Sequence, residues 1–133
     1  MLTVEGAPSA QAVHGLPQRI LRLEGLVLLA VALAAFFGEL DERWWLVPLL
    51  LFVPDLFMAG YARSTRVGAA VYNLGHSYPA PALLGAVAVA SSSSLWEAVA
   101  LIWFAHIGMD RALGFGLKYD DSFKHTHLGW LKE

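Results

Sequence analysis

The segment from Gly25 to Phe37 contains no polar side chain, and this feature most restricts what the chain can fold into. A helix of this composition is apolar around its whole circumference, which is typical of a membrane helix or of one that is fully buried. A soluble fold would need polar faces on its helices, and the other apolar segments lack them too. At 57% hydrophobic residues, the chain also exceeds the composition of ordinary soluble domains. We therefore predict an integral membrane protein whose main partner is the lipid bilayer.

Four apolar segments are long enough to cross a bilayer, which takes about 17–25 helical residues. They are Ile20–Gly38, Trp44–Ala62, Val67–Ala90 and Leu95–Leu113. The prediction is an all-α fold, a four-helix transmembrane bundle over residues 19–117. A flexible N-terminal tail (residues 1–18) precedes it, and a C-terminal tail (residues 118–133) folds back on it. We expect this small bundle to form a homo-oligomer if it is to enclose a cavity.

Helix-breaking and helix-starting residues lie inside these segments. Pro48 and Pro54 are expected to distort the second segment, and Pro79 to kink the third, because proline lacks the N–H group that a helix interior needs. Ser94 and Glu97 have the spacing of a capping box, which predicts that the fourth helix begins at this serine.

Lysine and arginine gather at one end of the predicted helices. They are Arg19 and Arg22 before the first segment, Arg63 and Arg66 in the second loop, and Arg111, Lys118, Lys124 and Lys132 near the C-terminus. The first and third loops contain only Arg43. Cytoplasmic loops are rich in these residues, so we predict that both termini and the second loop are cytoplasmic. The expected location is the inner (cytoplasmic) membrane, with multiple crossings.

Apart from Arg22, Glu97 and Arg111 near the segment ends, five ionisable residues interrupt the apolar segments: Glu24, Asp55, His76, His106 and Asp110. A charged side chain costs roughly 2.5–3.5 kcal/mol at the centre of a membrane helix, so such residues usually face the bundle interior and mark a function. At about 1.5 Å per helical residue, all five fall in the cytoplasmic half of the bundle. His106 and Asp110 are four residues apart and share one helix face.

Histidines and carboxylates that project inward from facing helices are a known way to bind metals in helical bundles. We predict that Asp55, His76, His106 and Asp110 bind a divalent cation. The chain has no cysteine, and this ligand set suits Zn, Mn or Fe better than Cu(I). A bound cation would supply a nucleophilic hydroxide, which favours hydrolysis of a membrane-accessible substrate such as a lipid or phosphoester.

Further polar residues complete the predicted site. Glu24 and His127 are expected to act as acid–base groups or additional ligands. His125 is expected to be solvated in the tail. The predicted substrate-binding residues are Asn73, Arg66, Arg111 and Lys118. The three cations among them suit an anionic headgroup or phosphate.

Two non-enzymatic functions are open alternatives. The polar residues would then form a proton or solute path, or would only pair with one another and fix helix packing. Apart from Glu97 at the start of the fourth segment, the outer halves of the four segments lack ionisable residues, which argues against a continuous path. A net charge of −2 gives no reason to expect a nucleic-acid partner.

Several strings of residues resemble one family in order along the chain. They are RLEG (Arg22–Gly25), PDLFMAGY (Pro54–Tyr61), YNLGHSY (Tyr72–Tyr78), AHIGMDRALGFGLKY (Ala105–Tyr119) and FKHTHLG (Phe123–Gly129). Together they resemble the small bacterial integral membrane proteins of the domain of unknown function 4260, from about Leu21 to Gly129. The resemblance implies a membrane protein but no activity. A looser similarity is to small membrane-bound metal-dependent hydrolases.

Overall fold

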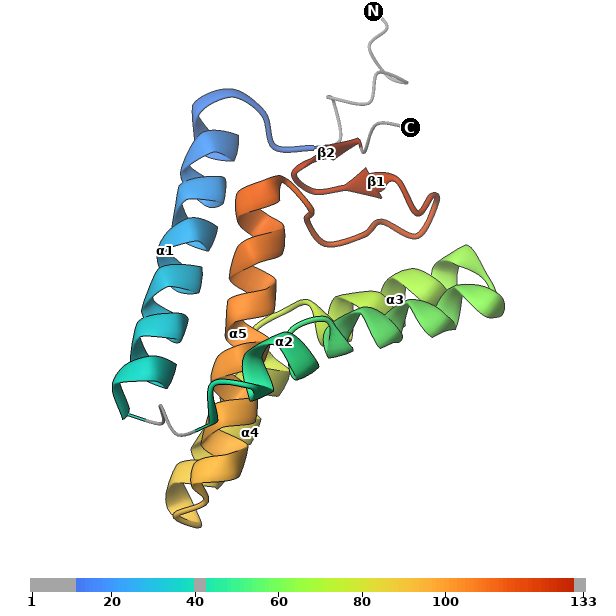
Figure 1. Ribbon diagram of the computed structural model, residues 1–133. Coiled ribbons are helices and arrows are strands. Elements are labelled where there is room, and N and C mark those ends of the chain that lie inside the picture. Colours follow the sequence, from blue (N-terminus) through green and yellow to red (C-terminus); the bar gives the residue numbers. More distant parts are fainter. Residues whose placement is uncertain (1–11, 40–42, 131–133) are drawn as a thin grey trace, which may run out of the picture.

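The computed structural model describes residues 12–39 and 43–130, and most of the chain is helical (Figure 1). The predicted flexible tail falls largely outside these residues, as do the last residues of the C-terminal tail. The elements are α1 (Gly15–Glu39), α2 (Leu46–Leu50), η3 (Val53–Ala62, a 3₁₀ helix), α3 (Thr65–Gly75), α4 (Pro79–Ala90) and α5 (Ser94–Leu113), followed by β1 (His125–Thr126) and β2 (Gly129–Trp130). The predicted all-α class is confirmed, apart from this short antiparallel hairpin.

Two of the four predicted segments are not single helices. The second is divided into α2 and η3, with Pro54 in the first turn of η3. The third ends as α3 at Gly75 and restarts as α4 at Pro79. Because proline has no N–H to donate, it fits the first turn of a helix but not its interior. The third segment, which was expected to kink at Pro79, is thus broken into two helices, and the break places His76 between them.

Helix α5 begins at Ser94 as expected, but its N-cap is one residue earlier than the capping box implies. Ser93 is the N-cap, and its hydroxyl accepts a hydrogen bond from the Trp96 amide at 3.3 Å. At the other end Gly114 adopts a left-handed conformation with a φ of 94°. This conformation suits glycine, and it turns the chain out of α5 toward the hairpin.

Helix α5 is the centre of the molecule. Helix α1 packs along it, α4 packs against it on another side, and α2 contacts it near a small core of Phe36, Leu46, Ala98 and Ile102. In Figure 1, η3 and α3 lie side by side and extend away from these helices. The β1–β2 hairpin lies beyond the end of α5, where the Val13 amide donates to the His127 carbonyl at 2.8 Å.

Helix α1 exposes most of its apolar surface. Only 17% of its most apolar 18-residue stretch is buried in the molecule. Side chains such as Leu23, Val27 and Val31 are more than half exposed. Among the described residues, α1 is the one helix that is long and apolar enough by itself to cross a membrane. Membrane association is therefore suggested by one helix.

Candidate metal centre

Helix α5 supplies two of the clustered side chains from a single face. His106 and Asp110 are one helical turn apart, and their Nε2 and Oδ2 atoms are 3.3 Å from each other. His106 is fully buried and Asp110 is 8% exposed. This burial follows from the position of α5 between the other helices.

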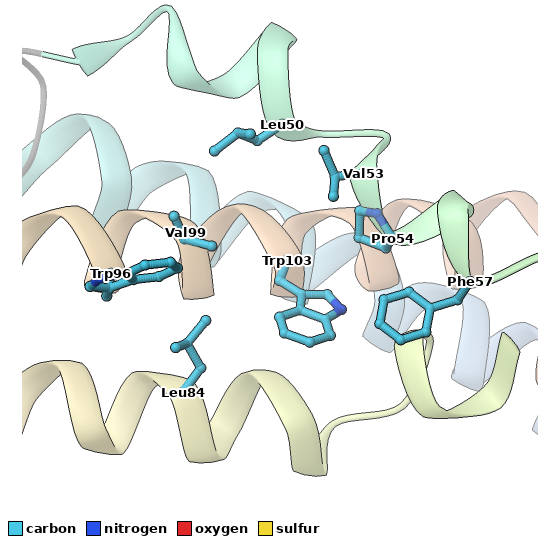
Figure 2. Close-up of a pocket in the computed structure, with 8 residues that line it drawn as sticks. All are labelled: Leu50, Val53, Pro54, Phe57, Leu84, Trp96, Val99 and Trp103. Carbon is cyan, nitrogen blue, oxygen red and sulfur yellow. The ribbon is translucent and has the colours of Figure 1, made fainter. Parts of the chain in front are cut away.

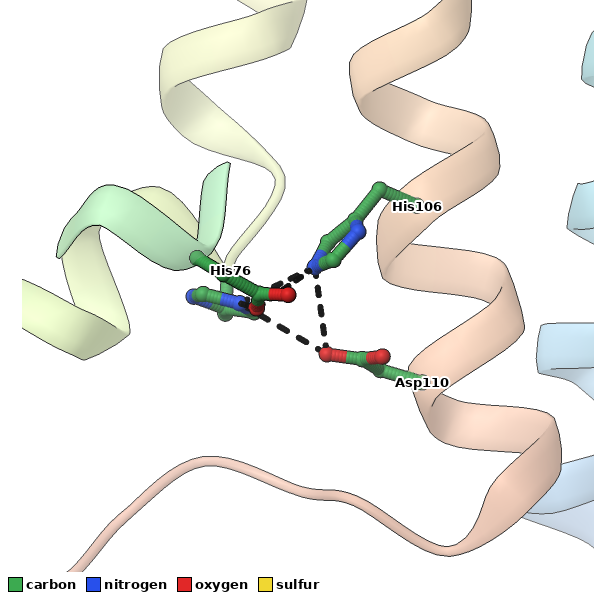
Figure 3. Close-up of side chains that lie close together, drawn as sticks. His76, His106 and Asp110 are labelled. Carbon is green, nitrogen blue, oxygen red and sulfur yellow. Dashed lines mark hydrogen bonds and ion pairs between the residues drawn. The ribbon is translucent and has the colours of Figure 1, made fainter. Parts of the chain in front are cut away.

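The other two side chains come from irregular parts of the chain. Asp55 lies in the first turn of η3, and His76 lies at the break that follows α3. These are the two places where proline interrupts the predicted helices. The interruptions let both side chains reach α5, as Figure 3 shows for His76 beside His106 and Asp110.

Four potential ligand atoms converge within 4.8 Å of one another. The two Nε2 atoms of His76 and His106 are 3.1 Å apart. Asp55 Oδ1 lies 3.2 Å from each of them. Asp110 Oδ2 lies 3.5 Å from His76 Nε2 and 3.3 Å from His106 Nε2. The structure thus brings together the four predicted metal ligands.

These separations match the edges of a small coordination polyhedron. Metal–ligand bonds of about 2.0–2.1 Å in a tetrahedron place the ligand atoms about 3.3–3.4 Å apart. Five of the six separations among the four atoms lie between 3.1 and 3.5 Å. The four side chains could therefore hold a divalent cation.

The hydrogen bond made by the other nitrogen of His76 leaves its Nε2 facing the other three side chains of the cluster. His76 Nδ1 lies 2.8 Å from the carbonyl oxygen of Tyr72 and must carry a proton to donate to it. In a neutral imidazole this leaves a lone pair on Nε2, directed at His106 and at two carboxylates. Such an arrangement of acceptors is repulsive unless a metal ion or a proton lies between them. Fixing a ligand histidine through its second nitrogen is typical of metal sites.

Two side chains of α5 hold the backbone around His76. The indole of Trp103 donates a 2.7 Å hydrogen bond to the Gly75 carbonyl, and Arg111 donates a 2.8 Å bond to the carbonyl of His76 itself. The ring of Tyr72 stacks on the His76 imidazole at 3.7 Å between centroids. The second ring nitrogen of His106 is held less firmly, since it lies near the Leu51 backbone without a hydrogen bond of standard geometry.

Asn73 and Lys118 are linked to each other. The Asn73 side chain donates to the Lys118 carbonyl at 2.8 Å and accepts from the Lys118 amide at 2.7 Å. This amide therefore holds the chain after α5 against α3. The Lys118 ammonium lies over the rings of Tyr72 and Phe123, and burial lowers the pKa of this lysine to about 8 although Asp110 opposes the shift.

Other predicted site residues are not brought to the cluster. Glu24 and Arg66 are exposed, on α1 and α3 respectively. His127 lies in the C-terminal hairpin, where its Nδ1 accepts a hydrogen bond from the Leu117 amide at 2.9 Å. Arg111 reaches the site only through the His76 backbone. Among the histidines and carboxylates that the structure describes, the group contains only these four residues.

The expectation of a solvated His125 is wrong. This histidine is 1% exposed, and its Nδ1 lies 2.8 Å from Asp121 Oδ1. The supporting roles of Trp103 and Tyr72 were not predicted from the sequence. Trp103 is three residues before His106, and Tyr72 is four residues before His76, so helical spacing could have indicated that each lies near its histidine. Aromatic residues with such spacing usually only pack in the core.

A family model described as Domain of unknown function (DUF4260) matches residues 18–131. The chain belongs to this family. The matched region includes all four residues of the cluster. No curated protein and no solved structure matches the chain.

Proposed function

We propose that this DUF4260 protein is a multi-pass protein of the inner membrane that binds one divalent cation, Zn, Mn or Fe. Asp55, His76, His106 and Asp110 are its ligands. The observation that carries the proposal is the convergence of two imidazole Nε2 atoms and two carboxylate oxygens at separations of 3.1 to 3.5 Å. Two carboxylates would neutralise the charge of the cation, which makes the buried site tolerable inside a membrane protein.

The membrane part of the proposal rests on exposed apolar surface. Large hydrophobic side chains are exposed on α1, on the α2–η3 segment and on α4, including Leu49, Leu56 and Leu83 at 62%, 72% and 68%. Soluble monomers rarely expose contiguous apolar areas larger than a few hundred Å². The basic residues near the N-terminus of α1 and the C-terminus of α5 support cytoplasmic termini by the positive-inside rule.

The reaction that we propose is metal-dependent hydrolysis of a membrane-accessible lipid or phosphoester. A divalent cation bound by the four residues would supply hydroxide by lowering the pKa of a bound water molecule. Four protein ligands fill a tetrahedral zinc site, whereas catalysis needs one further position for water. Asp55 is the most accessible of the four, with 34% of its side chain exposed. Water and substrate would therefore reach the cation from the Asp55 side.

The test is the metal content of the protein purified in detergent without chelators, measured by elemental mass spectrometry. We expect one Zn, Mn or Fe per chain, and its loss in His106→Ala. His14→Ala is the matched control, because His14 is an exposed histidine outside the cluster. The control should retain the full metal content. Circular dichroism of each variant checks that loss of metal is not loss of fold.

Absence of metal from the unaltered protein, also after incubation with each of the three cations, would contradict the proposal. The four side chains would then share a proton and fix helix packing. In that case Asp110→Asn combined with His106→Gln, which keeps the polar contacts, should leave stability nearly unchanged. A metal site predicts instead that this double variant loses the cation.

A further inference from the structure

An apolar pocket adjoins the four-residue cluster. It has a volume of about 170 Å³ and lies between the α2–η3 segment, α4 and α5 (Figure 2). Its lining residues are Leu50, Val53, Pro54, Phe57, Leu84, Trp96, Val99 and Trp103. None of these side chains carries a polar atom apart from the two indole nitrogens. The indole of Trp103 is already bonded to the Gly75 carbonyl.

The chemistry of the lining selects the occupant. A polar group inside this pocket would lose its hydrogen bonds to water and find almost none in return, at a cost of several kcal/mol in an apolar environment. Hydrocarbon meets no such cost. The volume is close to that of a cavity of roughly 150 Å³ known to hold a benzene molecule, so the pocket holds about six carbons of a chain.

One end of the pocket is adjacent to the proposed metal ligands. Pro54 directly precedes Asp55, and Trp103 lies one helical turn before His106. Phe57 and Trp103 pack together there, with ring centroids 6.2 Å apart. Trp96 lies at the opposite end, as Figure 2 shows, and is 51% exposed. A chain in the pocket would therefore run from the metal cluster along α5 toward Trp96.

The pocket rim continues into the exposed apolar surface. Val53 and Trp96 are both lining residues and partly exposed, at 42% and 51%. In a bilayer, this rim would face lipid tails and not water. A membrane lipid can then enter sideways without exposing its chain to water, whereas a soluble apolar ligand would have to cross the lipid first.

We infer that this pocket holds one acyl chain of a membrane lipid while the headgroup end of that lipid lies at the Asp55–His76–His106–Asp110 cluster. This inference rests on the proposed function for the headgroup end. The chain end rests on the pocket alone. The inferred substrate class is therefore an acyl lipid, and the bond nearest its headgroup would lie beside the cation.

The experiment is photolabelling in phosphatidylcholine vesicles that contain a trace of diazirine-bearing phosphatidylcholine. One probe carries the diazirine close to the ester, and a second carries it about six carbons further along the chain, the length that the pocket holds. Mass spectrometry locates the adducts. We expect the first probe to label Pro54, Phe57 and Trp103, and the second to label Leu84 and Trp96.

Pocket-filling variants separate bound lipid from general contact with the bilayer. Val99→Trp should lower pocket labelling, relative to labelling of α1, by about fourfold or more, which is the effect of one buried methylene group on affinity. Leu84→Phe narrows the pocket from the opposite helix and is the second variant, should the first not fold. Val31→Trp on the exposed face of α1 is the matched control and should not change pocket labelling.

Equal labelling of the pocket in the unaltered protein and in both filling variants would overturn the inference. A reversed order, with the near-ester probe at Trp96, would also overturn it because the headgroup would point away from the cluster. The same measurement after chelation isolates the proposed function. If pocket labelling persists and its order does not depend on metal, the chain site stands and the metal-dependent part of the proposal fails.

Discussion

The position of His76 depends on side chains that do not touch the ligand atoms. Trp103 and Arg111 of α5 hold the carbonyls of Gly75 and His76, at 2.7 and 2.8 Å. The histidine is the C-cap of α3, where its own amide donates to the Asn73 carbonyl at 3.2 Å and the helix ends. Helix α5 therefore supplies two ligands directly and orients a third.

Trp103→Phe tests this orientation. It removes the indole N–H and keeps an aromatic ring, so the Gly75 carbonyl loses its partner. We expect metal affinity to fall about tenfold or more, as for other partners that orient metal ligands, with the helical content unchanged. Competition with a chromogenic chelator measures the affinity. Trp96→Phe changes the same residue type at an exposed position and should bind metal normally. Equal affinities in the two variants would contradict the prediction.

His127 makes the C-terminal hairpin sensitive to acid. Burial lowers the pKa of His127, and the nearby charge of Arg111 lowers it further. Its Nδ1 accepts from the Leu117 amide, which a protonated Nδ1 cannot do. The unfolded chain therefore binds a proton at a higher pH than the folded chain, and stability falls as the pH drops below about 6.5 toward the lowered pKa.

His127→Asn keeps an acceptor at this position but does not titrate. We expect its melting temperature to depend less on pH than that of the unaltered protein between about pH 5 and 7, the range in which histidine titrates. Thermal unfolding followed by circular dichroism measures the difference. His14→Asn, at an exposed histidine, controls for the loss of a titrating side chain. Parallel pH profiles in all three proteins would rule out this role for His127.

At the scale of elements, the contact between α1 and α5 depends on two glycines. A Cβ atom added at Gly108 would lie 2.6 Å from the Gly25 carbonyl oxygen and 2.7 Å from the Leu29 amide nitrogen. Both neighbours are backbone atoms and cannot rotate away. The two helices can therefore approach this closely only without side chains at the crossing point, an arrangement that is common in membrane helix pairs.

Gly108→Ala should force α1 and α5 apart. We expect a loss of about 1–3 kcal/mol in unfolding free energy, the usual cost of overpacking. Gly85→Ala is the matched control, because its added Cβ meets only Ala100 Cβ at 3.6 Å. That variant should be neutral or stabilised by up to about 1 kcal/mol through helix propensity. Unfolding in mixed micelles measures both. Equal stabilities would show that the crossing tolerates a methyl group.

The sequence predicted the residues of the cluster better than the elements that hold them. The four ligands could be chosen because ionisable residues are rare in apolar segments, and helical spacing placed His106 and Asp110 together. Proline identified the interrupted segments, but not how far η3 and α3 would turn away from the bundle. That direction depends on packing between distant residues. Glu24 also fits the pattern of buried charge, yet its helix face remains exposed.

At the scale of the whole molecule, the proposed membrane orientation predicts which loops face each side. The chain contains no cysteine, so a single introduced thiol is the only site for a maleimide. Thr65→Cys, at the start of α3, should react only from the cytoplasmic side, and Ser94→Cys, at the start of α5, only from the outside. A membrane-impermeant maleimide applied to intact and to lysed cells measures this. Labelling of both thiols from one side would contradict the four-crossing arrangement.

The η3–α3 pair extends away from the helices around α5 (Figure 1), and the Asn73–Lys118 hydrogen bonds and the Tyr61–Phe123 ring contact hold it to the segment after α5. Asp55 and His76 lie on this pair or at its end, whereas His106 and Asp110 lie on α5. A cation bound by all four would join the two parts, so its release would be coupled to their separation. Dissociation would then be limited by a motion of the protein. Its rate constant should reach a plateau as chelator concentration rises, and that plateau would measure how often the two parts open.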